Sequence, residues 1–232
     1  FKQSLADSSF DAWTKFYKQD ENAPNAISNY YAKGSLVALG LDLVIRERSG
    51  QRFSLDDVMR ALWEQYGRRF YQDKPEGLAE DAFSQLVKDC TGVSIDHELS
   101  QWVEGTEDVP LQQLLRTQDI ELKWVSTDHT PTLGATFKSQ GESLIIRQVI
   151  EGGAAHRAGL SAGDNLIACD GLRIGNTTKA LQDLLAVYQP GDTITLTCFR
   201  DDVLLSKKVV LAKPPPATCE LQTLATLAPR AD

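Results

Sequence analysis

The spacing of apolar residues changes once along the 232-residue chain, and this change most limits what the chain can fold into. From Ser8 to about Gln118, apolar residues recur at the three- and four-residue spacing of one helix face. From about Glu121, short β-rich runs alternate with clusters of Gly, Pro and Asp, which is typical of strands joined by turns. The sequence therefore predicts an α+β protein. Its expected parts are a helical bundle, a linker, a β-rich domain and a tail, at 1–120, 121–131, 132–213 and 214–232.

Capping signals set the expected starts of two of the three helices described here for the first half. Ser8-Ser9-Phe10-Asp11 resembles a capping box and begins a helix with an aromatic face. A second helix is expected from about Asn29 to Arg48, and apolar side chains surround it almost completely, so we expect it to be buried among other helices. Ser54-Leu55-Asp56-Asp57 is another capping box and begins the third helix. The aromatic face comprises Phe10, Trp13, Phe16 and Tyr17, and the second helix carries Leu36, Val37, Leu39, Leu41, Leu43, Val44 and Ile45.

Net charge and hydropathy exclude two kinds of partner. The formal net charge is -8, whereas nonspecific nucleic-acid binding needs a cluster of Lys and Arg side chains on the surface, so such binding is not expected. The sequence has no apolar run of the ~18 residues that a membrane span requires. The chain shows no secretory signal. It opens with Phe1-Lys2-Gln3 and not with methionine, so we expect it to be a piece of a longer protein.

The four cysteines, Cys90, Cys169, Cys198 and Cys219, lie far apart and form no C-x-x-C pair. A zinc ribbon or a disulfide scaffold is therefore not expected, and the thiols are expected to be free and mostly buried. Unpaired thiols favour the cytoplasm as the compartment, with a periplasmic parent protein as the alternative.

Three phrases in the second half carry a family resemblance. They read GAAHRAGL at 153–160, AGDNLIACDG at 162–171 and QPGDTITL at 189–196. In this order, with a helix expected at 178–188, they resemble the PDZ domain of bacterial proteases over about 132–212. The resemblance implies a groove in which a peptide C-terminus adds as a strand beside a helix, with its carboxylate held by backbone N–H groups of a short loop.

Carried over by position, the carboxylate loop is Leu133-Gly134-Ala135. Thr136 and Phe137 would begin the strand that receives the peptide, and Leu181 and Leu184 would shape the side-chain pocket. The same residues must also pack the fold whether or not a ligand binds. The groove is therefore expected either to bind a peptide C-terminus or internal strand, or to serve as a structural surface that docks on a catalytic part.

The approach to the second helix carries another resemblance. Tyr31-Ala32-Lys33-Gly34 matches the Tyr-x-Lys-Gly phrase found at a buried helix start in zinc aminopeptidases of the gluzincin type. The surrounding phrases resemble one branch of these enzymes, the PDZ-bearing glycyl aminopeptidase family, along nearly the whole chain. These phrases lie at 4–13, 30–43, 54–62 and 105–114, and the PDZ pattern follows them.

In that family, the tyrosine of this phrase donates a hydrogen bond to the oxyanion of the tetrahedral intermediate. The resemblance implies this role for Tyr31 in the parent enzyme, while Tyr30 would pack beside it or line the substrate pocket. A neutral phenol, with a pKa of about 10, suits such a donor. Two core aromatics are the alternative interpretation. Gly34 and Gly40 would let the helix pack closely against its neighbours.

The zinc-binding motif of such an enzyme is missing from the sequence. Gluzincins need H-E-x-x-H, in which two histidines hold the metal and the glutamate activates water. His97-Glu98-Leu99-Ser100-Gln101 begins like this motif but ends in Gln, so we interpret it as a chance match on a surface helix. His129 and His156 belong to the linker and to a turn.

The sequence therefore predicts a C-terminal fragment of a zinc aminopeptidase, with no cofactor in this chain and zinc in the parent protein. Its expected partners are the missing N-terminal catalytic part and peptides at the PDZ groove, with no nucleic acid and no membrane. The alternative is a stand-alone peptide-binding PDZ adaptor without catalysis.

Overall fold

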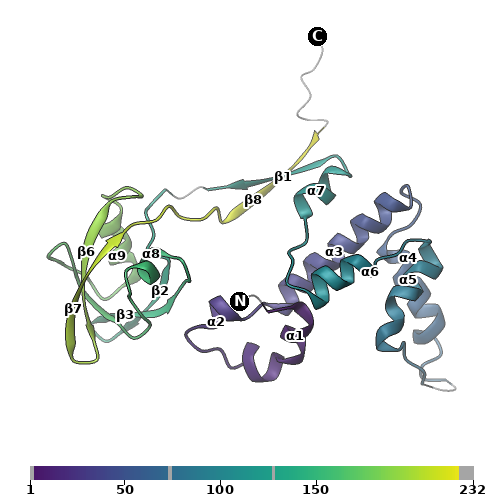
Figure 1. The fold of residues 1–232 in the computed structure, drawn as a ribbon, viewed down its shortest axis with the longest axis horizontal. Helices are drawn as coiled ribbons and strands as arrows, with labels where there is room; N and C mark the ends of the chain where they lie inside the picture. The colour runs from purple at the N-terminus through teal and green to yellow at the C-terminus, as the bar shows by residue number, and fades with distance from the viewer. Residues whose placement is uncertain (1–2, 73–74, 127–128, 225–232) are drawn as a thin grey trace, which may run out of the picture. The chain divides into compact units, whose positions relative to one another are not determined.

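The computed structural model describes residues 3–72, 75–126 and 129–224, which form two compact units (Figure 1). The helical unit consists of residues 3–16, 28–123 and 220–224. The β unit consists of residues 17–27 and 124–219, so a short early segment belongs to it. Helices together with antiparallel sheets confirm the predicted α+β class.

The helical unit is built around the long helix α3 (Tyr30–Arg48). Its other elements are α1 (Leu5–Phe10), η1 (Ala12–Phe16), α4 (Leu55–Leu62), η2 (Trp63–Gly67), η3 (Glu80–Ala82), α5 (Phe83–Thr91), α6 (Asp96–Leu99), η4 (Ser100–Glu104) and α7 (Leu111–Arg116). α4 lies beside α5 in both ribbon views (Figure 1). One apolar core joins these elements, and Ile45, Val58, Val87 and Ile95 are fully buried in it.

The first helix begins earlier than predicted. Ser4 caps α1, because its hydroxyl accepts from the backbone N–H of Asp7 at 3.0 Å. Ser8 lies inside the helix and donates to the carbonyl oxygen of Ser28, so the capping box predicted at Ser8 is wrong. The aromatic face predicted after it is largely open to solvent, since Phe10 is 92% exposed and Trp13 is 78% exposed.

Helix α3 confirms the predicted boundaries but not the predicted burial. Asn29 caps it, and it ends at Arg48. Gly40 has the predicted packing role, because a Cβ there would lie 2.6 Å from Cγ1 of Val109, whereas a Cβ on Gly34 would meet no described atom within 4 Å. Two of the surrounding leucines remain exposed, namely Leu36 at 44% and Leu39 at 40%. The buried apolar side chains of α3 are Val37, Leu41, Leu43, Val44 and Ile45, so apolar residues do not bury the helix on all sides.

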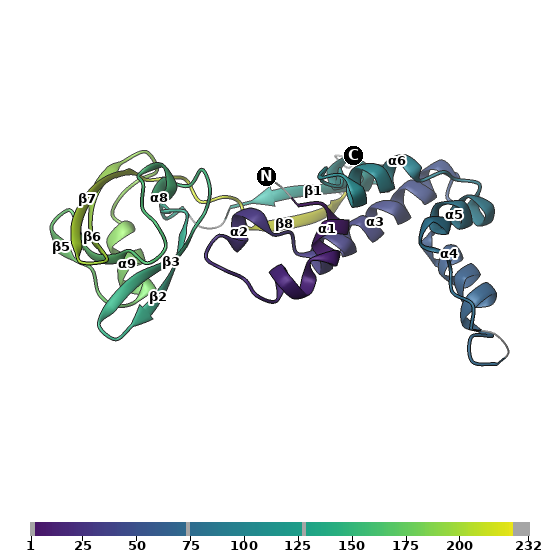
Figure 2. The ribbon, with the colours of Figure 1, turned by 60° about the horizontal axis from the view of Figure 1, so that its bottom comes forward.

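The β unit contains a six-stranded antiparallel sheet in the order β2-β3-β4-β6-β7, with β5 paired to β4. Its elements are α2 (Ala23–Ala26), β2 (Ala135–Gln140), β3 (Ser143–Val149), α8 (Ala154–Arg157), β4 (Asn165–Cys169), β5 (Leu172–Arg173), α9 (Thr178–Leu185), β6 (Thr193–Arg200) and β7 (Val203–Val210). The sheet curves around α9 (Figure 2). Leu181 and Leu185 of α9 are buried in the core that this curvature creates.

Aspartates fix two turns of the β unit. Asp164 is fully buried and accepts from the backbone N–H of Ser161 at 2.9 Å and from Nε of Arg200 at 2.8 Å. Asp170 has φ 47° and accepts from the backbone N–H of Thr195 at 2.6 Å. These two aspartates satisfy donors that the chain leaves unpaired where it reverses direction.

A second, two-stranded sheet pairs β1 (Ile120–Val125) with β8 (Thr218–Thr223). Part of the predicted tail is therefore a docked strand. The sequence of this tail shows no strong period, which is compatible with a loose tail or with a short docked segment, and its pairing partner β1 lies far away in the sequence. None of the helices in the described ranges is long and apolar enough to cross a bilayer.

All four cysteines are free, which confirms the prediction of unpaired thiols. Cys169 and Cys198 are buried, Cys90 is half-buried and Cys219 is exposed. Burial raises the pKa of the Cys169 and Cys198 thiols, so both are held in the unreactive protonated form.

Candidate functional site

Two adjacent tyrosines lie in the first turn of α3 and stack on each other. The ring centroids of Tyr30 and Tyr31 are 4.2 Å apart, with 31° between the ring planes. Phe16, at the end of η1, meets both rings edge-on at centroid distances of 5.2 Å and 6.3 Å. Oδ1 of Asn29 accepts from the backbone N–H of Tyr31 at 3.1 Å, which fixes the turn that carries the rings.

The two tyrosines differ in exposure. Tyr31 is 62% exposed, whereas Tyr30 is half-buried between Tyr31 and Phe16. A phenol at this position combines a hydroxyl donor with the positive end of a helix dipole, and both favour nearby negative charge. Of the pair, Tyr31 is therefore the side chain that is more accessible to solvent.

A zinc site does not fit the residues present. The described part of the chain holds no group of three His, Cys, Asp or Glu side chains placed to bind a metal ion. His97 is exposed on α6, and His156 is exposed on α8.

Glu98 is buried although its neighbours Asp96 and His97 are exposed, as on the inner face of the predicted surface helix. Its side chain is 4% exposed, and its carboxylate pairs with Arg48, whose Nη1 donates to Oε2 at 3.2 Å. Arg48 also donates to the carbonyl oxygen of Ser94 at 2.8 Å. Glu98 therefore has a structural role in joining α6 to α3.

The residues predicted for peptide binding come together between β2 and α9. This β2–α9 groove has a volume of about 390 Å³. Its lining includes Leu133, Ala135, Thr136, Phe137 and Leu181 among the predicted residues. Leu185 lines it as well, whereas Leu184 packs against the core instead. A one-residue error along α9 explains this difference, because neighbouring helix positions point about 100° apart.

The predicted carboxylate loop is held tightly against the turn after β3. Gly134 has φ 66°, which only glycine adopts without strain, and a Cβ there would lie 3.0 Å from Cα of Gly153. Its backbone N–H donates to Oγ1 of Thr132 at 3.1 Å. Gly134 is thus required twice, by its backbone angle and by the close approach of Gly153.

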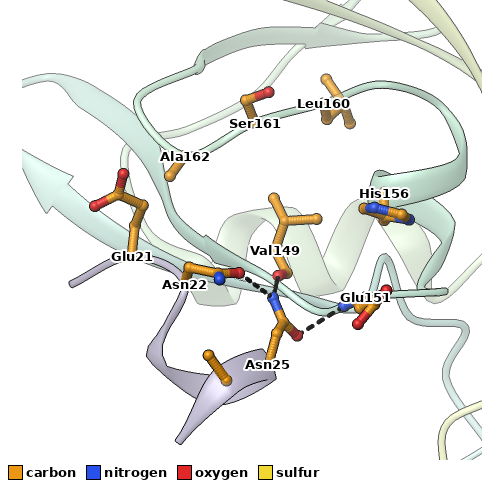
Figure 3. A pocket seen from close by; sticks show the side chains of 10 residues that line it. Glu21, Asn22, Asn25, Val149, Glu151, His156, Leu160, Ser161 and Ala162 are labelled. Carbon is orange, nitrogen blue, oxygen red and sulfur yellow. Dashed lines mark hydrogen bonds between the residues drawn. The ribbon is translucent and has the colours of Figure 1, made fainter. Parts of the chain in front are cut away.

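A second cavity of the β unit, the Glu21 pocket, has a volume of about 470 Å³ (Figure 3). It lies where residues 17–27 meet the end of β3, and Glu21, Glu151 and His156 line it. Figure 3 shows Asn25 between Val149 and Glu151, with its carboxamide bonded to both backbones. The Glu21 pocket is therefore formed where residues 17–27 pack against the rest of the β unit.

Sequence reasoning missed Asn25, Thr132 and Phe16. Asn25 follows Pro24 in a short polar stretch, which signals a turn but not the strand end it binds, 124 positions away. Thr132 lies two residues before Gly134, a spacing at which a hydroxyl can accept from the backbone, and this signal was available.

Comparisons with known proteins agree with the two resemblances. Residues 131–211 match the family model of the PDZ domain, and residues 1–37 match that of the M61 glycyl aminopeptidase. A solved aminopeptidase N family protein from Idiomarina loihiensis shares 34% sequence identity with a TM-score of 0.81. The similarity covers 95% of this chain but only 39% of that protein.

Curated relatives show partial matches. Protein PALS1 of Danio rerio is 31% identical over 104 residues, which are 44% of this chain and 13% of that protein. Protein PALS2 of Homo sapiens is 31% identical over 93 residues, or 39% of this chain and 17% of that protein. The two family matches, their order and the likeness along nearly the whole chain make it similar to part of a PDZ-bearing protein of the glycyl aminopeptidase family.

Proposed function

We propose that this chain forms part of a zinc-dependent aminopeptidase that removes N-terminal residues from peptides. The helical unit contributes Tyr31 as the donor that stabilises the oxyanion of the reaction. The β unit contributes a groove that binds a peptide C-terminus or an internal strand. The observation that carries the proposal is the phrase Tyr31-Ala32-Lys33-Gly34, which lies inside the glycyl aminopeptidase match at an exposed helix start.

The surroundings of Tyr31 support its catalytic role. A donor aimed at developing negative charge is worth about 2.7–4 kcal/mol when it is held in place before the reaction. Tyr30 and Phe16 contact the Tyr31 ring, and the cap at Asn29 fixes its backbone. These contacts restrict the ring while leaving it 62% exposed.

The exposed apolar side chains of the helical unit support a protein partner. They include Phe10, Trp13, Tyr31, Leu36, Leu39 and Trp63. Exposed apolar surface of this kind marks places that another protein part covers. We take the N-terminal catalytic part as this partner, because the solved aminopeptidase N family protein is matched over only 39% of its length.

The topology of the β unit supports peptide binding. Strand β2 ends the order of the described sheet, so one of its sides lacks a neighbouring strand. Such an edge can accept an extended peptide, whose side chains would then face the β2–α9 groove. Phe137 and Leu181 offer apolar contacts there.

A stand-alone adaptor is the second candidate function. One observation favours it: the lining of the β2–α9 groove comes from the β unit alone. The two candidates share the groove and differ in catalysis, so an activity assay separates them.

Hydrolysis of an aminoacyl chromogenic substrate tests the catalytic part. The chain alone with added zinc is expected to show no turnover, and the full-length protein is expected to show it. Turnover by the chain alone would contradict the assignment of metal ligands to another part. A coding sequence that starts just before Phe1, with no upstream H-E-x-x-H, would favour the adaptor.

Titration with a library of free C-terminal peptides tests the groove. Saturable binding is expected, with chemical-shift changes in β2 and α9. Absence of binding at a peptide concentration of about 1 mM, which corresponds to only about 4.1 kcal/mol, would favour a docking surface instead.

A further inference from the structure

Asn25, in α2, binds the end of β3 through both polar atoms of its side chain (Figure 3). Its Nδ2 donates to the carbonyl oxygen of Val149 at 2.9 Å, and its Oδ1 accepts from the backbone N–H of Glu151 at 2.8 Å. A carboxamide has the same donor and acceptor as a peptide group. Asn25 therefore bonds on both sides of Ile150, as a residue of a neighbouring parallel strand would.

Ile150, between these two bonds, holds the carboxylate loop. Its backbone N–H donates to the carbonyl oxygen of Gly134 at 2.9 Å. The carbonyl oxygen of Leu133, one peptide group earlier in the loop, accepts from the N–H of Ala155 at 2.7 Å. The turn after β3 and the first turn of α8 thus bind two successive carbonyl groups of the loop, and Asn25 binds the turn after β3.

When a carbonyl group of the loop is held, the direction of the N–H in the same peptide group is fixed as well. In a trans peptide group, the C=O and the N–H point in opposite directions. The carbonyl of Leu133 shares its peptide group with the N–H of Gly134, and the carbonyl of Gly134 shares its group with the N–H of Ala135. Because the turn holds the carbonyl of Gly134, it directs the N–H of Ala135 away from itself, whereas the N–H of Gly134 donates to Oγ1 of Thr132. The N–H of Ala135 is therefore the loop donor that we expect to hold a peptide carboxylate.

We propose that Asn25 is a positioning residue for peptide recognition, which holds the turn that aims the N–H of Ala135 at the terminal carboxylate of a peptide. This inference rests on the proposed peptide-binding function of the groove. Asn25 does not line the β2–α9 groove, so it acts on the peptide only through the turn and the loop. The ligand class is a peptide with a free C-terminus rather than an internal strand.

The test compares Asn25→Ala and Asn25→Asp with the matched control Asn176→Ala. Asn176 also donates from Nδ2 to a backbone carbonyl, that of Gly141 at 2.9 Å, but at the tip of the β2–β3 hairpin. Asn25→Asp keeps an acceptor for Glu151 and loses the donor for Val149. Each variant is titrated with one dye-labelled peptide in its free-acid and C-terminally amidated forms, and its free energy of unfolding is measured.

Asn25→Ala is expected to weaken binding of the free-acid peptide about tenfold and to leave the amidated peptide unchanged. The affinity ratio between the two peptide forms therefore falls. Asn25→Asp is expected to lie between wild type and Asn25→Ala, and Asn176→Ala to keep the wild-type ratio. An equal loss for both peptide forms, or an unchanged ratio in Asn25→Ala, would overturn the positioning role.

A measurement without peptide separates this inference from the proposed function. The amide signals of Gly134 and Ala135 in ¹H–¹⁵N spectra are expected to shift in Asn25→Ala and to stay in place in Asn176→Ala. If wild type binds neither peptide form, the proposed binding function of the groove is wrong. A shift of these signals would still show that Asn25 influences the loop through the turn. If the signals do not shift, the inference fails by itself.

Discussion

The β unit and the helical unit differ in how complete their candidate sites are. In the β unit, a strand edge, a loop and a helix face form the β2–α9 groove from residues of one unit. In the helical unit, Tyr31 is held in place and 62% exposed, but no metal-binding cluster accompanies it in the described part of the chain. The described residues of the β unit thus form a whole groove, whereas those of the helical unit form a stacked pair of tyrosines at a helix start.

The two units share one structural device despite this difference. Each buries a carboxylate against an arginine that stays partly exposed. Glu98 is 4% exposed beside Arg48, and Asp164 is 0% exposed beside Arg200. Since an unpaired buried charge is costly, each pair is required by the fold that surrounds it.

Core substitutions test whether the two units are separate. Leu196 of β6 and Ile45 of α3 are both fully buried. Leu196→Ala and Ile45→Ala are each expected to lower the free energy of unfolding of their own unit by about 2–5 kcal/mol. Hydrogen exchange followed by mass spectrometry measures the loss of protection in each unit.

Phe10→Ala is the control, because Phe10 is 92% exposed. It is expected to change the free energy of unfolding by less than about 0.5 kcal/mol. Equal loss of protection in both units after either core substitution would show that they do not unfold separately.

Breaking the two ion pairs is expected to lower the free energy of unfolding by less than the core substitutions do. Arg48→Met and Arg200→Met each leave a buried carboxylate unpaired. Partial exposure of the arginines reduces the effect to about 2–3 kcal/mol, below the roughly 3–5 kcal/mol of a fully buried pair. Chemical denaturation measures both variants. Arg68→Met, which breaks the exposed pair with Glu64, is the control, and losses as small as in this control would contradict the structural role of the buried pairs.

The smallest expected effect is a pH dependence confined to the β unit. The backbone N–H of Thr195 and then the hydroxyl of Tyr188 lower the pKa of Asp170. A lowered folded-state pKa gives stability that is complete above the unfolded value of about 3.9 and is lost as the pH falls. The hydrogen bond to Asp170 also raises the pKa of Tyr188 to about 12. Stability from Tyr188 is therefore complete below about pH 10 and lost as the pH rises further.

Asp170→Asn tests this prediction, because asparagine also tolerates the positive φ of this position. Thermal unfolding of wild type and variant is compared between about pH 2 and 12. The advantage of wild type is expected to shrink at both extremes. A constant difference across the whole range would contradict the role of the Asp170–Tyr188 bond.

Features set by neighbouring residues could be predicted from the sequence. Asn29 and the Ser54–Asp57 box cap helices within their own first turn, and the start of α3 and of α4 followed from them. The same local rule failed at Ser8, because Ser4 offers an equally good cap and the Ser8 hydroxyl is used by Ser28.

Features that depend on distant pairing could not be predicted. The carboxylate loop was located from its phrase, but the turn that holds it is bonded to Asn25 across 124 positions. Burial of Glu98 depends on Arg48, and β8 depends on β1. In each case the chain signals a polar or extended segment, and only the three-dimensional fold supplies its partner.

The kinetics of Tyr31→Phe in the full-length protein test the central claim most directly. Phenylalanine keeps the ring stacked on Tyr30 and removes only the hydroxyl. If Tyr31 stabilises the oxyanion, kcat falls by about 100- to 1,000-fold while KM changes little. Tyr30→Phe is the matched control and is expected to keep kcat within a few-fold of wild type. A kcat of Tyr31→Phe equal to that of wild type would contradict the account.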